Sequence, residues 1–203
     1  TSGVGLFLAV GKYMLTIAGG LTIHILIVLP CLFYFLTGIH PRKHFRAMAS
    51  ALVTAFSTSS SNATLPVTIR CVKENAGVSN KVSSFVLPMG ATINMDGTAL
   101  YECAGVLFIS QALGIELSIA SQFIIVITAL LASIGAAGIP SAGLVMIFIV
   151  TQAVGFQDEQ VATIIGIMLA VDRPLDMMRT MVNIFSDSIG AVIIAKSEGE
   201  ILY

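Results

Sequence analysis

Long apolar stretches alternate with short polar clusters along the 203-residue chain. Residues 14–39, 47–69 and 117–157 contain no Asp, Glu, Lys or Arg. A helix rising about 1.5 Å per residue crosses a bilayer with about 20 apolar residues. The pattern therefore predicts an all-α membrane protein with transmembrane helices.

Two of the apolar stretches have polar or glycine-rich middles. Residues 47–69 contain a Ser-rich run at 57–62 and are flanked on both sides by basic clusters, which mark the cytoplasmic face. Residues 117–157 contain a Gly-rich centre and have acidic or neutral flanks. Since each stretch begins and ends on one side, we expect two re-entrant helical hairpins that enter from opposite faces. The alternatives are a linker for the serine run and two full spans for the second stretch.

A third interruption falls at Asn94-Met95-Asp96-Gly97-Thr98, inside an apolar segment. Asn, Asp and Gly are poor helix-interior residues, so this segment is predicted to be a broken helix. Such breaks bind ions and solutes in transporters built from inverted repeats, and the order of elements here suggests such a repeat. The expected divisions are the end of a scaffold region with a first helix (1–40), the first hairpin (41–81), the broken helix (82–115), the second hairpin (116–157), and a last helix with a cytoplasmic tail (158–203).

Composition supports the membrane class. The chain is 56% hydrophobic and 10% charged, against roughly 25% charged residues in soluble domains. A net charge of −1 argues against a nucleic-acid partner. The three cysteines lack metal-ligand spacing and are expected to be unpaired, and nothing predicts an enzyme cofactor. Because the chain begins at Thr1 inside an apolar stretch, we expect an N-terminal portion to be missing.

The last helix carries polar residues at helical spacing. Asp176, Arg179, Thr180, Asn183 and Asp187 fall on one stripe. The stripe supplies the groups that an amino dicarboxylate needs: Asp176 for the ammonium group and Arg179 as a bidentate fork for a carboxylate. The alternative is an internal Asp176–Arg179 salt bridge that only fixes packing.

The same region offers oxygen ligands for sodium, a hard cation. They are the side chains of Asn94, Asp96, Asn183 and Asp187 and the carbonyls near Gly90 and Thr92. A set without His or Cys points away from transition metals. Glu102, on the helix after the break, is a candidate proton carrier, with a hydrogen-bonded structural carboxyl as the alternative.

Four motifs resemble a known family. They are SSSNATLP (59–66), GATINMDGTALYE (90–102), ASIGAAGIP (132–140) and DMMRTMVN (176–183). The chain resembles the glutamate/aspartate transporter family, the dicarboxylate–sodium symporters that include the excitatory amino-acid transporters. The resemblance covers about residues 11–200 and matches the C-terminal half of the family. It implies a multi-pass plasma-membrane symporter of glutamate or aspartate that works by alternating access. It also implies a homotrimer held by a scaffold missing from this chain, with sodium as coupling ion and H⁺ and K⁺ coupling left open.

The resemblance also implies residue roles. The substrate pocket would comprise Ser60, Ser61, Thr98, Ile139, Gly143, Asp176, Arg179, Thr180 and Asn183. The first sodium would take Gly90, Asn94, Asn183 and Asp187. The second would take Thr92 with backbone carbonyls of Ser133, Ile134 and Ala136. The third would use Asn94 and Asp96 with ligands from an absent helix, and Glu102 would serve proton or potassium coupling.

Two residues of the chain depart from the family pattern, and three alternative functions remain open. Ser59 stands where archaeal members have Arg, and Met177 stands where animal members have Arg, so Arg179 lacks both helpers. Glu102 matches the animal glutamate transporters.

The alternative functions are a neutral amino-acid exchanger, which Arg179 opposes, an intramembrane aspartyl protease using Asp96 and Asp176, and an anion channel.

Overall fold

The computed structural model describes residues 3–136 and 138–203, and this part of the chain contains helices and no strand. Ala137, within the third motif, and residues 1–2 of the first predicted division lie outside the described residues. The elements are α1 (Gly3–Ile23), η1 (His24–Val28), α2 (Leu29–Thr37), α3 (Pro41–Thr58), α4 (Ser61–Ala76), α5 (Asn80–Ile93), α6 (Asp96–Leu113), α7 (Ile119–Gly135), α8 (Ala142–Ala153) and α9 (Asp158–Ser197). The predicted all-helical class is confirmed.

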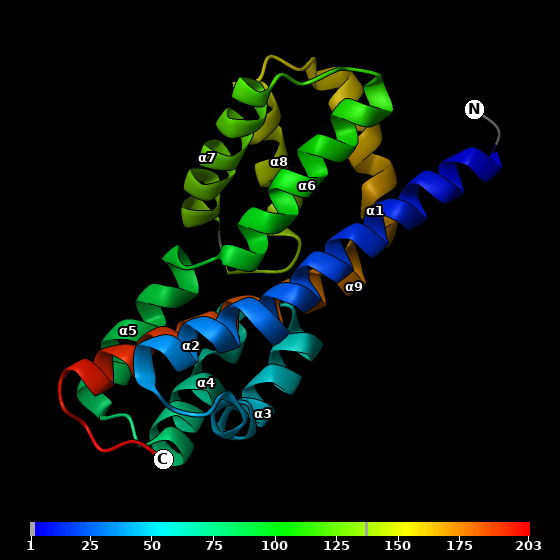
Figure 1. Ribbon diagram of the computed structural model, residues 1–203. Helices are drawn as coiled ribbons and strands as arrows, with labels where there is room; N and C mark the ends of the chain where they lie inside the picture. Colours follow the sequence, from blue (N-terminus) through cyan, green and yellow to red (C-terminus); the bar gives the residue numbers. More distant parts are fainter. Residues whose placement is uncertain (1–2, 137) are drawn as a thin grey trace.

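The 40-residue helix α9 connects two groups of helices. Its first half packs against α6 and α8, its second half lies among α2, α3, α4 and α5, and α1 also packs against it (Figure 1). Most residues from Val182 to Ala195 are buried, as expected for a helix surrounded on all sides. The polar stripe on α9 is therefore placed in the centre of the molecule.

The first apolar stretch forms one helical rod with an irregular middle. A π-helical segment, His24–Val28, joins α1 to α2, and the Leu29 N–H donates to the His24 carbonyl. Pro30 lies just after this π turn and has no N–H for a regular helical bond, which accounts for the irregular hydrogen bonding here. In the part of the chain described here, Leu8–Thr37 is the helical stretch long and apolar enough to cross a membrane.

Two pairs of consecutive helices fold back on themselves. Ser59 ends α3 in the left-handed conformation (φ 52°), and Ser60 caps α4 by accepting a hydrogen bond from the Ala63 N–H at 3.2 Å. Helices α7 and α8 pack together in the same way, and Ser141 (φ 60°) precedes α8. With 17 and 12 residues, α7 and α8 are each shorter than the roughly 20 residues that cross a bilayer.

The predicted helix break is confirmed. α5 ends at Ile93 and α6 begins at Asp96, and the φ/ψ pairs of Asn94 (−105°, 78°) and Met95 (−116°, 58°) are not helical. The break lies beside the middle of α9, because α5 and α6 both pack against that helix.

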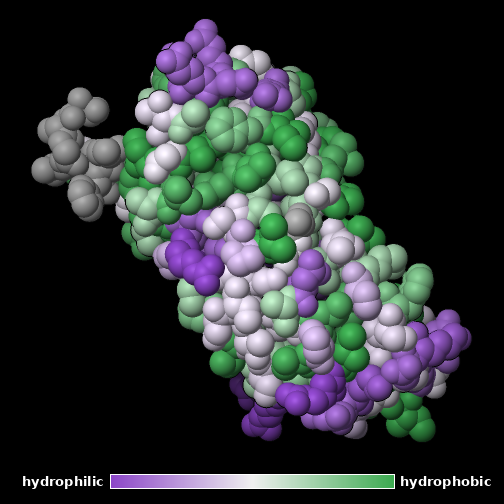
Figure 2. Space-filling model, turned by 180° about the vertical axis from the view of Figure 1, so that it is seen from behind, coloured by the Kyte–Doolittle hydropathy of each residue, from purple (hydrophilic) through white to green (hydrophobic). Residues whose placement is uncertain are grey.

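The surface is more apolar than the surface of a typical water-soluble protein. On the face in Figure 2, the largest hydrophilic groups lie at the two ends, and the surface between them mixes hydrophobic residues with a pale band that contains a few hydrophilic ones. Large exposed side chains include Leu15, Phe35, Phe85, Ile119 and Phe123. Exposed apolar area on this scale indicates contact with lipid or other protein.

Candidate functional site

The helix break, the two helical tips and the middle of α9 meet around one small cavity. The free space inside it is only about 20 Å³, room for roughly one water molecule, so its walls are nearly in contact in this structure. The lining residues include Ser61, Thr98, Ile139, Gly143, Asp176, Arg179, Thr180 and Asn183. The structure therefore brings together every predicted pocket residue except Ser60.

Ser60 instead joins the two tips. Its hydroxyl donates to the Gly138 carbonyl at 2.6 Å, and the Asn62 N–H donates to the same carbonyl at 3.3 Å. A side chain at Gly138 would crowd the Ala91 carbonyl, because a Cβ there would lie 3.0 Å from that oxygen. The α3–α4 tip and the α7–α8 tip thus lie close together at Gly138.

The charged centre of the cavity is the Asp176–Arg179 pair on α9. Both side chains are buried, and Nη2 of Arg179 donates to Oδ1 of Asp176. The Ser141 N–H donates to Oδ2 of Asp176 at 2.9 Å, and Nη1 of the half-exposed Arg173 lies 3.9 Å from the same oxygen. The sequence alone did not show which way Arg173 faces.

The guanidinium of Arg179 retains bonding capacity. Its carbon lies 4.3 Å from the centre of the Tyr101 ring, in a cation–π contact. Its Nη1 is buried and has no hydrogen-bond partner among the described residues. A buried charged donor is costly unless something pairs with it, so this atom indicates an anion-binding position. The internal salt bridge exists, but it does not satisfy the guanidinium.

Amide and hydroxyl groups complete the cavity. Asn183 donates through Nδ2 to the Thr98 hydroxyl at 3.0 Å and accepts from the Gly97 N–H at 2.9 Å. The Thr180 hydroxyl donates to the Asp176 carbonyl at 2.9 Å. The start of α6 therefore packs directly on α9, and Gly97 permits this because a Cβ there would lie 2.9 Å from the Arg179 carbonyl.

An oxygen-rich cluster lies next to the cavity, on the other side of the helix break. Asp187 is buried and accepts from Asn94 Nδ2 at 2.9 Å. Gly90 faces this carboxylate so closely that a Cβ on it would lie 2.6 Å from Oδ1. Three of the four residues predicted for the first sodium are thus in contact, while the Asn183 amide oxygen bonds to Gly97.

Asp96 belongs to the same cluster. The Ser186 hydroxyl donates to Asp96 Oδ1 at 2.9 Å and accepts from Asn94 Nδ2 at 2.8 Å. His24 Nε2 lies 2.6 Å from Asp96 Oδ2, which places the π turn of the first helix beside this site. Sequence reasoning missed Ser186, although it lies three residues after Asn183 and so on the same helix face.

The second predicted sodium set is less compact. Thr92 donates its hydroxyl to the Met89 carbonyl at 2.8 Å, and Ser133 donates to the Leu130 carbonyl at 2.9 Å. The Ala136 N–H donates to the Ser133 carbonyl at 3.2 Å. Ile134 lies between these two residues, in the last turn of α7. Helices α5 and α7 are in contact, but within the described residues no hydrogen bond joins Thr92 to the end of α7.

Glu102 is fully buried on α6, one turn beyond Thr98. Neither of its carboxyl oxygens has a hydrogen-bond partner in the described part of the chain. The geometry therefore does not match the alternative of a hydrogen-bonded structural carboxyl.

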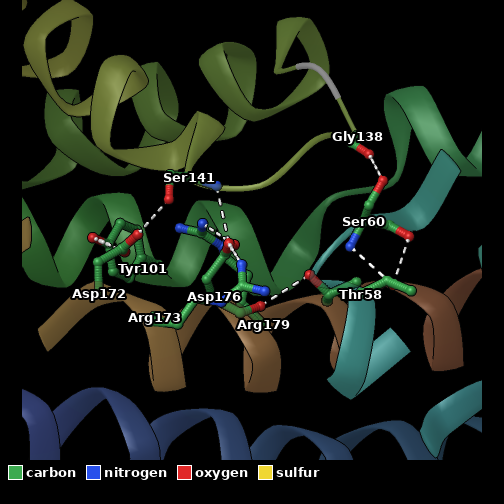
Figure 3. A network of polar contacts seen from close by, with 10 residues as sticks. Thr58, Ser60, Tyr101, Gly138, Ser141, Asp172, Arg173, Asp176 and Arg179 are labelled. Carbon is green, nitrogen blue, oxygen red and sulfur yellow. Dashed lines mark hydrogen bonds and ion pairs between the residues drawn. The ribbon is translucent and has the colours of Figure 1, made fainter. Parts of the chain in front are cut away.

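Three residues around the charged pair had no predicted role. Tyr101 donates to Asp172 Oδ1 at 2.7 Å, and Ser141 donates through its hydroxyl to Asp172 Oδ2 at 3.0 Å (Figure 3). Asp172 lies one helical turn before Asp176, and that spacing was the signal available in the sequence.

These features define a class. A broken helix, two helical tips, a buried carboxylate–guanidinium pair and a neighbouring oxygen cluster form the type of ion and solute site found in secondary transporters. The chain belongs to the sodium:dicarboxylate symporter family, whose model matches residues 1–197.

Named relatives agree with this assignment. The chain is 51% identical over 191 residues to excitatory amino acid transporter 3 of Mus musculus, covering 94% of this chain and 36% of that protein. It is 50% identical over 182 residues to excitatory amino acid transporter 1 of Homo sapiens, covering 90% and 33%. It is 48% identical over 182 residues to an excitatory amino acid transporter of Caenorhabditis elegans, covering 90% and 35%. The chain thus spans about a third of the length of these relatives.

The family is named for symport, and the relatives above are named as transporters and not as enzymes. The protease alternative is therefore wrong, and Asp96 and Asp176 need no hydrolytic role.

Proposed function

We propose that the protein carrying this chain is a sodium-coupled symporter of acidic amino acids, glutamate or aspartate, in the plasma membrane. The observation that supports this most is the free Nη1 of Arg179 in the cavity between the tips. A second carboxylate on the solute would accept a charge-assisted hydrogen bond from that nitrogen. A neutral amino acid would leave it unpaired.

The other end of the solute would be held by Asp176. Its Oδ2 now accepts from the Ser141 N–H, so an incoming ammonium group would share or replace that donor. Thr98, Thr180 and Asn183 would bind the remaining carboxylate from one side. Ser60, Ser61, Ile139 and Gly143 would close the pocket from the two tips.

Sodium would bind beside the solute. The first ion would take Asp187 with Gly90, Asn94 and Asn183, and its charge would offset the buried carboxylate. A second would take Thr92 with the carbonyls of Ser133, Ile134 and Ala136. A third would use Asn94 and Asp96 with ligands from outside this chain.

The helix pairs α3–α4 and α7–α8 would be re-entrant hairpins from opposite faces, related as an inverted repeat with α5–α6 and α9. The 17- and 12-residue lengths of α7 and α8 support this proposal for the second pair. In this multi-pass arrangement residues 40, 81, 115 and 157 would mark the divisions between its parts. Cysteines replacing the exposed Lys43 and Lys81 should both label from the cytoplasm, whereas labelling from opposite sides would disprove the first hairpin.

Proton or potassium coupling would use Glu102, because its carboxyl is buried and unpartnered. Assembly as a homotrimer rests on the family resemblance alone.

The function is tested by uptake in proteoliposomes containing the complete protein, with sodium, proton and potassium gradients imposed separately. Glutamate or aspartate uptake should require an inward sodium gradient, and serine or alanine should not compete. Sodium-dependent serine exchange without acidic uptake would establish the neutral-exchanger alternative instead.

A further inference from the structure

Ser141 lies at the tip between α7 and α8 and makes two hydrogen bonds to α9. Its backbone N–H donates to Asp176 Oδ2 at 2.9 Å, and its hydroxyl donates to Asp172 Oδ2 at 3.0 Å (Figure 3). Because both acceptors are buried carboxylates, these are charge-assisted bonds in a low-dielectric setting. The tip is therefore fastened at two points on one helix face.

The backbone of Ser141 is held in an uncommon conformation. Its φ of 60° and ψ of 13° lie in the left-handed region, which non-glycine residues adopt only when their surroundings fix them. The two bonds to α9 provide that fixation. Glycine would adopt this backbone conformation more easily, but it would lack the hydroxyl that bonds to Asp172.

The two attachment points differ in one respect. Under the proposed function, the solute ammonium competes with the Ser141 N–H for Asp176. Asp172 faces no such competition, since its two oxygens accept from Tyr101 and from the Ser141 hydroxyl. The hydroxyl bond can therefore persist when the solute occupies Asp176.

Asp172 also connects the tip to the guanidinium. Its other oxygen accepts from the Tyr101 hydroxyl at 2.7 Å, and the buried Tyr101 ring lies against Arg179. If the tip moved away, Asp172 would lose one of its two donors while remaining buried, which is unfavourable. The closed tip and the placement of the Tyr101 ring are thus linked through one carboxylate.

We propose that the Ser141 hydroxyl is a latch that holds the α7–α8 tip closed through Asp172, both without solute and while the solute occupies Asp176. Ser141 is a positioning residue in this role. Its hydroxyl need not touch the solute. The inference deepens the proposed function and rests on it for the nature of the solute.

The first test compares three substitutions in the complete protein, with sodium-dependent glutamate binding and release as readouts. Ser141→Ala and Ser141→Gly both remove the hydroxyl, but Gly also relieves the backbone. Each should weaken affinity about 10- to 100-fold, the effect of losing a charge-assisted bond, mainly through faster release. Ser141→Asn, which tolerates the left-handed region and offers an amide donor, should recover most of the loss.

A double-mutant cycle separates the latch from a general packing effect. In an Asp172→Asn background, Ser141→Ala should weaken affinity clearly less than in the wild type, at most about tenfold, because only a neutral amide acceptor remains. An equal loss in both backgrounds would overturn the proposal. So would wild-type binding and release in Ser141→Ala and Ser141→Gly.

A third measurement does not depend on the solute. Spin labels at the exposed positions Leu131 on α7 and Leu169 on α9, with the exposed Cys31 replaced, would report tip opening in sodium alone. Ser141→Ala should broaden the distance distribution toward longer values, and an unchanged distribution would refute the latch. Failure of the wild type to bind glutamate would refute the proposed function, and this distance test would still decide the latch.

Discussion

Replacing Gly90 with alanine should impair sodium binding through one contact. A Cβ at this position would lie 2.6 Å from Asp187 Oδ1 and 2.9 Å from Cγ, closer than van der Waals contact allows. Asp187 cannot swing into solvent freely, because it is buried and bonded to Asn94. Overpacking of this kind costs about 1–3 kcal/mol. If the cost falls on the sodium-bound state, sodium affinity drops about 5- to 150-fold.

Gly190 provides a matched control. It lies on α9 three residues after Asp187, and a Cβ there would meet nothing within 4 Å. The assay is the sodium concentration that gives half-maximal glutamate binding, together with the melting temperature without sodium. Gly90→Ala should raise that concentration at least about fivefold. Gly190→Ala should leave it within about twofold. A wild-type sodium dependence in Gly90→Ala would show that Asp187 does not bind sodium next to Gly90.

Three further predictions concern charged groups. Arg179→Cys should abolish acidic amino-acid binding and permit small neutral amino acids, because losing a charge-assisted pair costs roughly 2–5 kcal/mol. Calorimetry showing acidic affinity within about threefold of wild type would contradict this. Glu102→Gln should preserve sodium-dependent exchange but eliminate the pH and potassium response of net uptake; an unchanged response would exclude Glu102. At the tail, hydrogen bonding to Ser79, through its side chain and through its N–H at 2.8 Å, lowers the pKa of Glu200. The bond is therefore present at neutral pH and lost as pH falls through that lowered pKa, so the protection factor of the Ser79 amide should fall in acid, and Glu200→Gln should remove this pH step.

The sequence predicted the elements well, because each is specified by local residues. Uncharged apolar runs specified the helices, and Asn94 with Gly97 specified the break between α5 and α6. The serine run became the two-residue turn between α3 and α4, where Ser59 ends one helix and Ser60 begins the next. These are effects of propensity and capping, which act within a few residues.

The pocket residues on α9 were also readable, since helical spacing puts Asp176, Arg179, Thr180 and Asn183 on one face. The roles of these residues were harder to predict from the sequence. The sequence could not show that Asp176 satisfies only part of the Arg179 guanidinium, because that depends on which groups from other helices reach Nη1.

Only the tertiary structure decided the contacts between segments that lie far apart in the chain. His24 meets Asp96 across 72 positions, Ser60 meets Gly138 across 78, and Tyr101 meets Asp172 across 71. No periodicity encodes these pairs, because they arise where separate helices pack and buried polar groups must find partners there. The sequence by itself determined which segments are helical, where they break and which side chains share a face. The packing of both tips on α9 decided which oxygen each donor reaches, and hence how Ser141 is held.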